Sequence, residues 1–333
     1  MILAGDIGGT KCNLALYEAD GRSHRKIVEH RYASRQFPTF DGLISAFLAD
    51  CRAGMAQTTA TRVQAAGFGV AGPIIDRRVK TTNLPWMIEA SALSVQLGTP
   101  HVVLLNDLEA TAHGLALLGP SEISTLNPGV SSPHANQALL AAGTGLGESI
   151  LFWNGAGHLV SSTEGGHTDF APRTEQEIEL LRFMKKQYEF VSLELILSGR
   201  GFQTIHTFLD PSVQHPSFTG PEADAAPEIT RLALEGKCPV CVETLDLWVS
   251  IYGSEAGNLA LKTLARGGVW VAGGIAVKIR KKMEDGTFFQ AFRAKEMFGA
   301  MLAQIPVKMV LNEDAPLLGA MSQAVRAAGL QPA

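Results

Sequence analysis

The chain of 333 residues is 46% hydrophobic and 18% charged, which supplies enough apolar material for a sizeable core and excludes general disorder. At about 150 residues per domain, this length predicts two domains. The net charge of −4 argues against a nucleic-acid partner, since composition forces no basic face.

The N-terminus does not have the pattern of a signal peptide. Asp6 interrupts the first apolar run, and no basic residue precedes it. The sequence contains no run of about 18 apolar residues, so we expect no membrane-spanning helix. Only four cysteines are present, which fits a reducing compartment. We therefore expect a cytoplasmic protein that does not bind membranes.

The first part of the chain alternates short apolar runs, typical of strands, with segments of helical spacing. Its opening run, residues 2–7, leads through Gly8-Gly9-Thr10 into a second strand. Strands are predicted at 2–7, 12–18, 63–70 and 102–105. Helices are predicted at 39–51, 92–97 and 108–118.

The same opening recurs after a Ser- and Pro-rich stretch at 120–136. There the predicted strands 138–142 and 148–153 flank the glycine turn 143–147. Further strands are predicted at 269–272 and 307–311, a surface loop at 210–227, and helices at 175–188, 193–197, 201–209, 229–234, 242–265 and 317–328. This recurrence predicts two related α/β domains facing each other across a central cleft. We place the smaller domain at 1–117 plus 313–333 and the larger at 118–312.

The two glycine turns are candidate phosphate-binding sites. Glycines let backbone N–H groups approach a phosphate closely, and Thr10 and Thr144 add hydroxyl donors. Asp6 can hold a hydrated Mg²⁺. The alternative is a pair of ordinary tight hairpins. A dinucleotide fingerprint is disfavoured, because Glu148 stands where its last glycine is needed, and no P-loop motif is present.

Asn106-Asp107 follows the predicted strand 102–105 and precedes a helix. Open α/β sheets bind their ligands at the carboxyl ends of their strands, so Asp107 is a candidate general base for a substrate hydroxyl. The alternative is that either residue simply caps the helix.

Two further segments combine glycines with possible ligand-binding roles. The loop 163–169 places Glu164 and His167 beside Gly165-Gly166, where both side chains can reach one ligand. Gly273-Gly274 follows the predicted strand 269–272 and either accommodates a nucleoside or forms a tight turn.

Cys238-Pro239-Val240-Cys241 has the spacing of half a metal site. No second pair follows it, and two thiolates do not complete a tetrahedral zinc site. We interpret the pair as small residues at the start of a helix.

Taken together, these residues make the chain resemble the bacterial glucokinase family, within the hexokinase/actin-like ATPase superfamily. A zinc-binding cysteine motif follows the Gly-His of the related repressor/kinase group, whereas Thr-Asp-Phe-Ala-Pro follows His167 here, which favours the zinc-free branch. The resemblance extends over nearly the whole chain and rests on these segments: Gly5–Thr10, Leu105–Ala110, Gly143–Gly147, Glu164–Pro172, Leu197–Gly199, Gly257–Leu261 and Ala272–Ile275.

The resemblance implies two RNase H-like (actin/hexokinase-type) domains and an ATP- and Mg²⁺-dependent kinase for glucose, usually a homodimer, acting in glycolysis. Asp107 would be the general base for the 6-hydroxyl. The other sugar-binding positions would be Asn83, Asn106, Glu164, His167 and Glu194, the last named from the resemblance alone. Phosphates and Mg²⁺ would contact Asp6, Gly8, Gly9, Thr10, Lys11, Gly143, Thr144, Gly273 and Gly274.

Phosphoryl transfer to a sugar favours closure around the substrate, because water competes as acceptor. We expect hinge movement near residues 117 and 312, seen as compaction by small-angle scattering when glucose is added. Three alternatives stay open: a kinase for another hexose, a non-catalytic sugar sensor of the same fold, and an actin- or chaperone-like ATPase. ADP or polyphosphate as phosphoryl donor also stays open.

Overall fold

The computed structural model describes residues 1–19, 23–54, 62–81, 84–218 and 224–330. The chain divides into two compact units. The first comprises Met1–Gly119 and Asn312–Ala333, and the second comprises Pro120–Leu311. Both contain helices and strands, which confirms the predicted α/β class.

The first unit is built on a sheet of five strands among the described residues, in the order β3-β2-β1-β4-β7. The strands β1, β4 and β7 run parallel, whereas β2 and β3 are antiparallel to their neighbours. Their bounds are Ile2–Ile7 (β1), Lys11–Ala19 (β2), His24–Ala33 (β3), Ala65–Val70 (β4) and Val102–Asn106 (β7). A separate ribbon pairs β5 (Arg78–Lys80) with β6 (Met87–Glu89).

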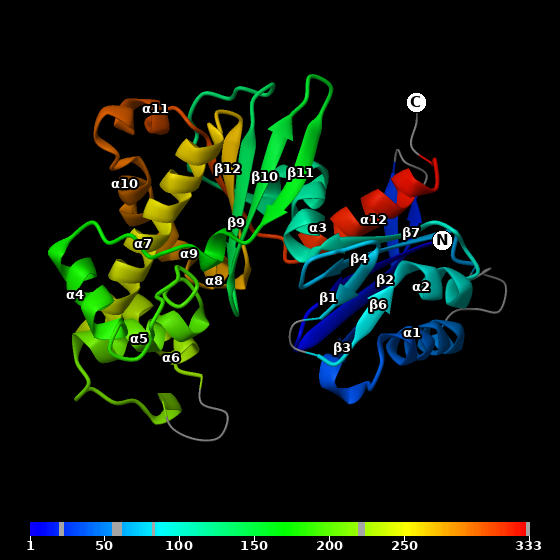
Figure 1. Cartoon of the computed structure of the whole chain (residues 1–333), viewed down its shortest axis with the longest axis horizontal. Coiled ribbons are helices and arrows are strands. Elements are labelled where there is room, and N and C mark those ends of the chain that lie inside the picture. Colours follow the sequence, from blue (N-terminus) through cyan, green and yellow to red (C-terminus); the bar gives the residue numbers. More distant parts are fainter. Residues whose placement is uncertain (20–22, 55–61, 82–83, 219–223, 331–333) are drawn as a thin grey trace. The chain divides into compact units, whose positions relative to one another are not determined.

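Helices cover both faces of this sheet, because the apolar side chains of β1 alternate between the faces. Leu3 and Ile7 belong to the core shared with α1 (Phe40–Gly54) and α2 (Ala90–Leu97). Ile2 and Ala4 belong to the core shared with α12 (Ala315–Ala327). In Figure 1, α12 (red) and α1 (blue) lie on opposite sides of the sheet.

Glycines allow α12 to meet α3 (Asp107–Gly114) at backbone distance. A Cβ on Gly319 would lie 1.8 Å from the carbonyl oxygen of Ala110, and a Cβ on Gly114 would lie 2.0 Å from that of Ala315. No larger residue fits at either position without moving a helix. The spacing of α3 and α12 is therefore set by their own sequences.

The second unit contains a sheet of six described strands in the order β11-β10-β9-β12-β13-β8. Here β9, β12 and β13 are parallel and the outer strands antiparallel. The bounds are Ile123–Asn127 (β8), Gln137–Ala142 (β9), Leu146–Trp153 (β10), His158–Thr163 (β11), Gly268–Ala272 (β12) and Val307–Val310 (β13).

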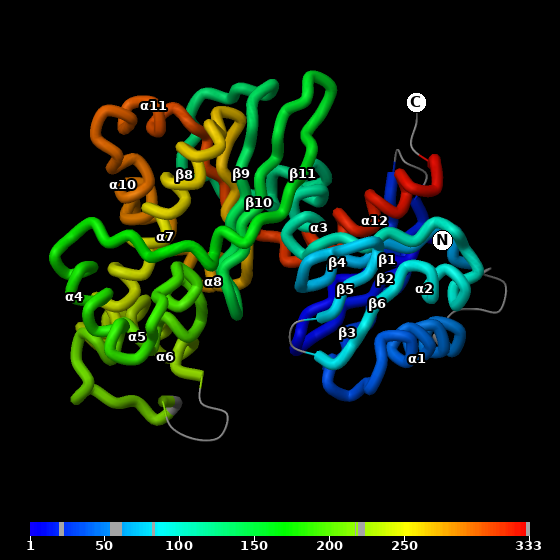
Figure 2. Tube along the Cα trace, viewed as in Figure 1, coloured from blue at the N-terminus to red at the C-terminus, as the bar shows by residue number. Residues whose placement is uncertain are grey.

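The long helix α7 (Pro239–Thr263) organises the second unit, since most of its residues are buried. It packs against α5, α6 and α10, whose course can be followed in Figure 2. The remaining bounds are Glu175–Met184 (α4), Gly199–Leu209 (α5), Ala226–Leu234 (α6), Gly274–Lys278 (α8), Arg280–Met283 (α9), Thr287–Arg293 (α10) and Gly299–Ala303 (α11). No helix in the described part of the chain is long and apolar enough to span a membrane.

The helix predicted at 193–197 is wrong. Leu193, Ile196 and Leu197 have helical spacing and are buried in the core, but they form a single turn. Tertiary hydrogen bonds hold this turn, because Leu193 N donates to the carbonyl of Thr168 and Glu194 N to that of Gly166. The edge strands β3, β8 and β11 were not predicted. Exposed polar residues mask the alternation of β3 and β11, and β8 lies within the Ser- and Pro-rich stretch 120–136.

Candidate functional site

Strand register brings several candidate residues of the first unit to one edge of its sheet. Ile7 pairs with Val70, and Val70 pairs with Asn106. Because these strands are parallel, the segments that follow them leave the sheet at the same edge. The Gly8–Thr10 turn and Asp107 therefore both lie at the carboxyl ends of the strands.

The Gly8–Thr10 turn is a tight hairpin, closed by a hydrogen bond of 3.0 Å from Gly8 N to the carbonyl of Lys11. The buried Ser34 stabilises the turn with two hydrogen bonds. Its hydroxyl donates to the carbonyl of Gly8, and its N–H donates to the carbonyl of Thr10. Gly8 does not have a positive φ, but a Cβ on it would lie 3.0 Å from the carbonyl oxygen of Lys11, so the tight hairpin itself favours glycine there. Thr10 and Lys11 are exposed and accessible to a ligand.

Asn106 caps helix α3. Its side-chain oxygen accepts from the N–H of Leu108 at 3.0 Å, and its amide nitrogen donates to the carbonyl of Gly72 at 3.3 Å. Asp107, the first residue of α3, also accepts from the N–H of Leu108, at 2.9 Å. The capping role that the sequence left open is thus the one seen for Asn106, and the positive end of the helix dipole stabilises a negative charge on Asp107.

Two neighbouring carboxylates act on Asp6 at this edge. Burial, and then the negative charges of Asp107 and Asp314, raise the pKa of Asp6 to about 7. Asp314 precedes α12 and pairs with Lys26 at 2.5 Å. Sequence reasoning missed Asp314, although its place between a predicted strand and a predicted helix was a usable signal. Carboxylate oxygens are ligands that Mg²⁺ prefers, so these residues fit a bound Mg²⁺.

In the second unit, the Gly143–Gly145 turn and Gly273-Gly274 share an edge of the sheet in the same way, because Ala141 pairs with Ala272 in parallel strands. Gly273 has a φ of 90°, and a Cβ there would lie 2.4 Å from the carbonyl of Ala142. A Cβ on Gly143 would meet nothing within 4 Å. Packing therefore demands glycine at 273, whereas at 143 glycine leaves open space beside the turn.

Glu194 is tied to the second glycine turn. Its Oε2 accepts from the N–H of Leu146 at 3.0 Å, and a Cβ on Gly145 would lie 2.3 Å from that oxygen. Gly145 therefore makes room for the Glu194 carboxylate beside the turn.

The structure brings Glu164, His167 and Glu194 together. His167 Nδ1 lies 3.8 Å from Glu164 Oε2, and His167 Nε2 lies 3.8 Å from Glu194 Oε1. Glu164 and His167 are largely exposed, at 77% and 61% of their side chains. Two carboxylates and an imidazole, open to solvent, can accept and donate hydrogen bonds to neighbouring hydroxyls of one polyol.

The glycines of the 164–167 loop explain how it reaches that position. A Cβ on Gly166 would lie 2.0 Å from the carbonyl of Leu146, and one on Gly165 would lie 2.0 Å from Glu148 Oε2. The loop therefore packs directly on the start of β10, next to Glu194.

The candidate residues thus form two groups, each described within its own unit. Asn83, named from the resemblance, lies outside the described residues. What the sequence did not indicate was which of the others share an edge, because that depends on strand order.

The chain is similar to known proteins over nearly its whole length. The family model described as Glucokinase matches residues 3–327. A glucokinase from Nostoc sp. is 35% identical, with 98% of this chain and 99% of the relative covered.

Among solved structures, a glucokinase from an Antarctic psychrotroph is 28% identical, with a TM-score of 0.81 and 98% of both chains covered. A ROK family glucokinase from Streptomyces griseus, solved with glucose and AMPPNP, is 22% identical, with a TM-score of 0.67, covering 98% of this chain and 99% of that one. These neighbours confirm the predicted two-domain actin-like ATPase fold.

Proposed function

Because the chain belongs to the glucokinase family and is an ATP-dependent hexose kinase, we propose that Asp107 is the general base of its reaction. In that reaction the γ-phosphoryl group of ATP passes to the 6-hydroxyl of glucose, giving glucose 6-phosphate and ADP. The observation that carries the proposal is the carboxylate of Asp107 at the N-terminus of α3, on the sheet edge that also holds the Gly8–Thr10 turn.

In the proposed step, the glucose O6 forms a bond to the γ-phosphorus while the bond from that phosphorus to the bridging oxygen breaks. The proton of the 6-hydroxyl passes to the Asp107 carboxylate. Such reactions depend mainly on positioning and on neutralising charge. The N-terminal position in α3 favours the negative charge that the Asp107 carboxylate carries when it accepts the proton.

We propose that the sugar's other hydroxyls bind Glu164, His167 and Glu194. His167 lies 3.8 Å from both Glu164 and Glu194, so the three side chains can contact neighbouring hydroxyls of one sugar. The side-chain oxygen of Asn106 caps α3, and its amide nitrogen donates one hydrogen to Gly72. We propose that the second amide hydrogen donates to the sugar. Asn83 stays a proposal from the resemblance alone.

The phosphates of ATP are proposed to bind the two glycine turns through Gly8, Gly9, Thr10, Lys11, Gly143 and Thr144, with Gly273 and Gly274 beside the nucleoside. Mg²⁺, held through water by Asp6, would neutralise the charge of the phosphates. The open space beside Gly143 supports this use of the second turn.

Location, assembly and pathway are further proposals. The four cysteines are free thiols in the structure, which supports a reducing, cytoplasmic environment. We propose a homodimer from the resemblance, to be checked by sedimentation equilibrium. Formation of glucose 6-phosphate would place the enzyme at the entry to glycolysis.

The substitution Asp107→Ala tests the base assignment. We expect the turnover number to fall by about 10² to 10⁴, the usual contribution of a positioned base, while calorimetry still detects glucose binding. The assay couples ADP release to an optical signal, with glucose and ATP·Mg²⁺ as substrates. Near-normal turnover in this variant would overturn the assignment.

Glu109→Gln is the matched control, since Glu109 also carries a carboxylate in the first turn of α3. It should retain most of the activity. The same assay with mannose, fructose and N-acetylglucosamine measures the preference for glucose. Binding of sugar without ADP release by the unmodified protein would instead indicate a sensor.

A further inference from the structure

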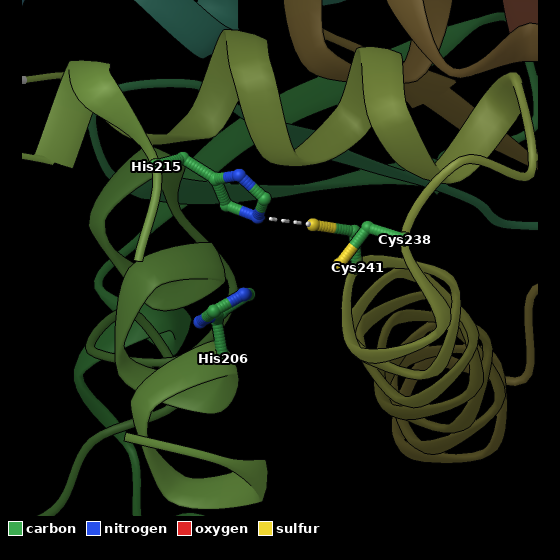
Figure 3. Close-up of side chains that lie close together, drawn as sticks. All are labelled: His206, His215, Cys238 and Cys241. Carbon is green, nitrogen blue, oxygen red and sulfur yellow. Dashed lines mark hydrogen bonds between the residues drawn. The ribbon is translucent and has the colours of Figure 1, made fainter. Parts of the chain in front are cut away.

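Four possible metal ligands, none of them a residue of the proposed kinase site, gather in the second unit. They are His206, His215, Cys238 and Cys241, and their ligand atoms all lie within 4.8 Å of one another. Figure 3 shows the two imidazoles and the two thiols pointing toward a common space.

Three separate elements contribute these side chains. His206 lies on the last turn of α5, and His215 lies in the segment that follows it. Cys238 is the N-cap residue of α7 and Cys241 lies in its first turn. The Cys-x-x-Cys spacing places both sulfurs at one helix start, and the chain folds back to bring the histidines opposite them.

The distances are close to those of a tetrahedral centre. Cys241 Sγ lies 3.5 Å from His215 Nε2. Bond lengths of about 2.3 Å to sulfur and 2.0 Å to nitrogen place the ligand atoms of zinc roughly 3.3–3.8 Å apart. Small side-chain rotations would therefore bring the widest pairs into range.

A second observation points to a missing ligand. The side chain of His206 is only 1% exposed, yet its Nε2 has no hydrogen-bond partner among the described residues. A buried ring nitrogen left unpaired is costly. Cys241 is fully buried and Cys238 is 8% exposed, so water does not readily satisfy this group of side chains.

From this geometry we propose that His206, His215, Cys238 and Cys241 bind one Zn²⁺ in a closed Cys₂His₂ site. The two thiols each release one proton on binding, and both imidazoles bind as neutral rings. Two thiolates balance the charge of the ion, so the occupied site is neutral and tolerates burial. The N-terminus of α7 further stabilises the thiolates.

The role that follows is structural. Four protein ligands leave no coordination position for a substrate. The ion would join the end of α5, the segment after it and the start of α7, and the affinity for zinc would add to the stability of the fold. Sequence reasoning considered only residues after Cys241 and therefore missed the histidines that precede the pair.

A redox-active pair of thiols is the competing interpretation of Cys-x-x-Cys. Reactive cysteines are partly exposed, whereas Cys241 is fully buried. A disulfide also would leave the nitrogen of His206 unpaired. The burial and the histidines together favour a metal over redox chemistry.

The experiment measures metal by mass spectrometry in the full-length protein as purified without chelator. We expect about one zinc ion per chain, as for other closed structural sites. Replacement by Co²⁺ should give the charge-transfer band of thiolate–cobalt bonds and the intense visible bands of a tetrahedral site. Cys238→Ser and His215→Asn should each lose most of the zinc and the charge-transfer band.

Control variants are Cys51→Ser, which removes a buried thiol of the first unit, and His134→Asn, which removes an exposed histidine of the second. Both should keep the zinc. Circular dichroism checks that each variant folds. If Cys238→Ser does not fold, His215→Asn tests the proposal in its place.

Metal-free protein that binds neither zinc nor cobalt would overturn the proposal. So would zinc that survives both substitutions, or a thiol titration showing that Cys238 and Cys241 form a disulfide. None of these readouts depends on kinase activity, so the outcome is independent of the proposed function.

Discussion

At the scale of single residues, Asp6 combines two opposed requirements. Burial and the charges of Asp107 and Asp314 raise its pKa to about 7, which disfavours the ionised form that a cation needs. A bound Mg²⁺ would reverse this balance, because it would place a positive charge beside the Asp6 carboxylate. Placing these carboxylates together lowers the stability of the cation-free protein, which supports a cation-binding role for this group of residues.

Asp6 therefore predicts a specific dependence of stability on pH. The pKa of Asp6 is about 7 in the folded state, compared with an ordinary value of 3.8. Its contribution to stability is complete below pH 3.8 and is lost as the pH rises through 7. Each pKa unit is worth about 1.4 kcal/mol, so the loss is at most about 4 kcal/mol. Denaturant unfolding of Asp6→Asn between pH 4 and 8, without metal, should show a shallower decline than the unmodified protein.

Glu148 sets a background for that comparison. Burial and the charge of Glu255 also raise its pKa to about 7, so some decline remains in Asp6→Asn. Added Mg²⁺ at pH 8 should stabilise the unmodified protein more than the variant. Parallel pH curves for the two proteins would contradict the assignment to Asp6.

At the scale of elements, the contact between α3 and α12 positions two of the three carboxylates. Asp107 begins α3 and Asp314 is the N-cap residue of α12. Gly114 and Gly319 let the two helices touch at the backbone. These two glycines thus help to determine how closely the starts of α3 and α12, with Asp107 and Asp314, approach each other.

The substitution Gly319→Ala tests this link. Its Cβ would lie 1.8 Å from the carbonyl of Ala110, so one helix must move. We expect a loss of stability of about 1–3 kcal/mol, as for other overpacked sites, and a fall in turnover larger than any change in the KM for glucose. Denaturant titration and steady-state kinetics measure the two effects.

Gly157→Ala is the matched control, because a Cβ at Gly157 meets nothing within 4 Å and its φ is not positive. Its stability should stay within about 0.5 kcal/mol of the unmodified protein. A Gly319→Ala variant as stable and active as this control would show that the helix contact does not matter.

At the scale of the whole molecule, the chain passes between the two units at Gly119–Pro120 and again at Leu311–Asn312. The proposed base lies in the first unit and Glu164, His167 and Glu194 lie in the second. Each unit has its own sheet and its own core. The three proposed sugar-binding side chains of the second unit are distinct from the proposed base, so sugar binding can be measured through protein stability, separately from turnover.

Differential scanning calorimetry with glucose makes this measurable. A ligand at about 100 times its Kd stabilises the folded state by about 2.7 kcal/mol. We expect glucose to raise the Tm of the unmodified protein and Glu194→Gln to lose most of that rise. Glu189→Gln, an exposed carboxylate nearby in sequence, should keep it. An unchanged glucose effect in Glu194→Gln would remove Glu194 from the sugar site.

Much of the fold could be read from local pattern. The strands predicted at 2–7 and 102–105 from short apolar runs, and the helix predicted at 242–265 from helical spacing, correspond to β1, β7 and α7. The turn at 193–197 was mistaken for a helix because its buried leucines mimic that period, while hydrogen bonds to residues 166 and 168 decide its form. Edge strands such as β3 were missed because their exposed faces carry charges.

The candidate site was predicted unevenly for a related reason. Asp107 and the glycine turns stand at the ends of recognisable strands, so position along the chain sufficed. Glu194 was named only from the resemblance, since nothing local indicates that its carboxylate lies beside Gly145. Asp314 was missed although it lies between a predicted strand and a predicted helix, and His206 and His215 were missed because they precede the cysteine pair.

By itself, the amino-acid sequence determined the α/β class, the two glycine turns, the acidic residue after the third parallel strand and the resemblance to glucokinases. These depend on residues that are neighbours in the chain, where periodicity and turn chemistry act. Only the tertiary structure decided which carboxylates share an edge, that Gly319 and Gly114 bring α3 and α12 together, and that two histidines face Cys238 and Cys241. Such juxtapositions depend on strand order and helix packing, which join residues that local sequence patterns do not relate.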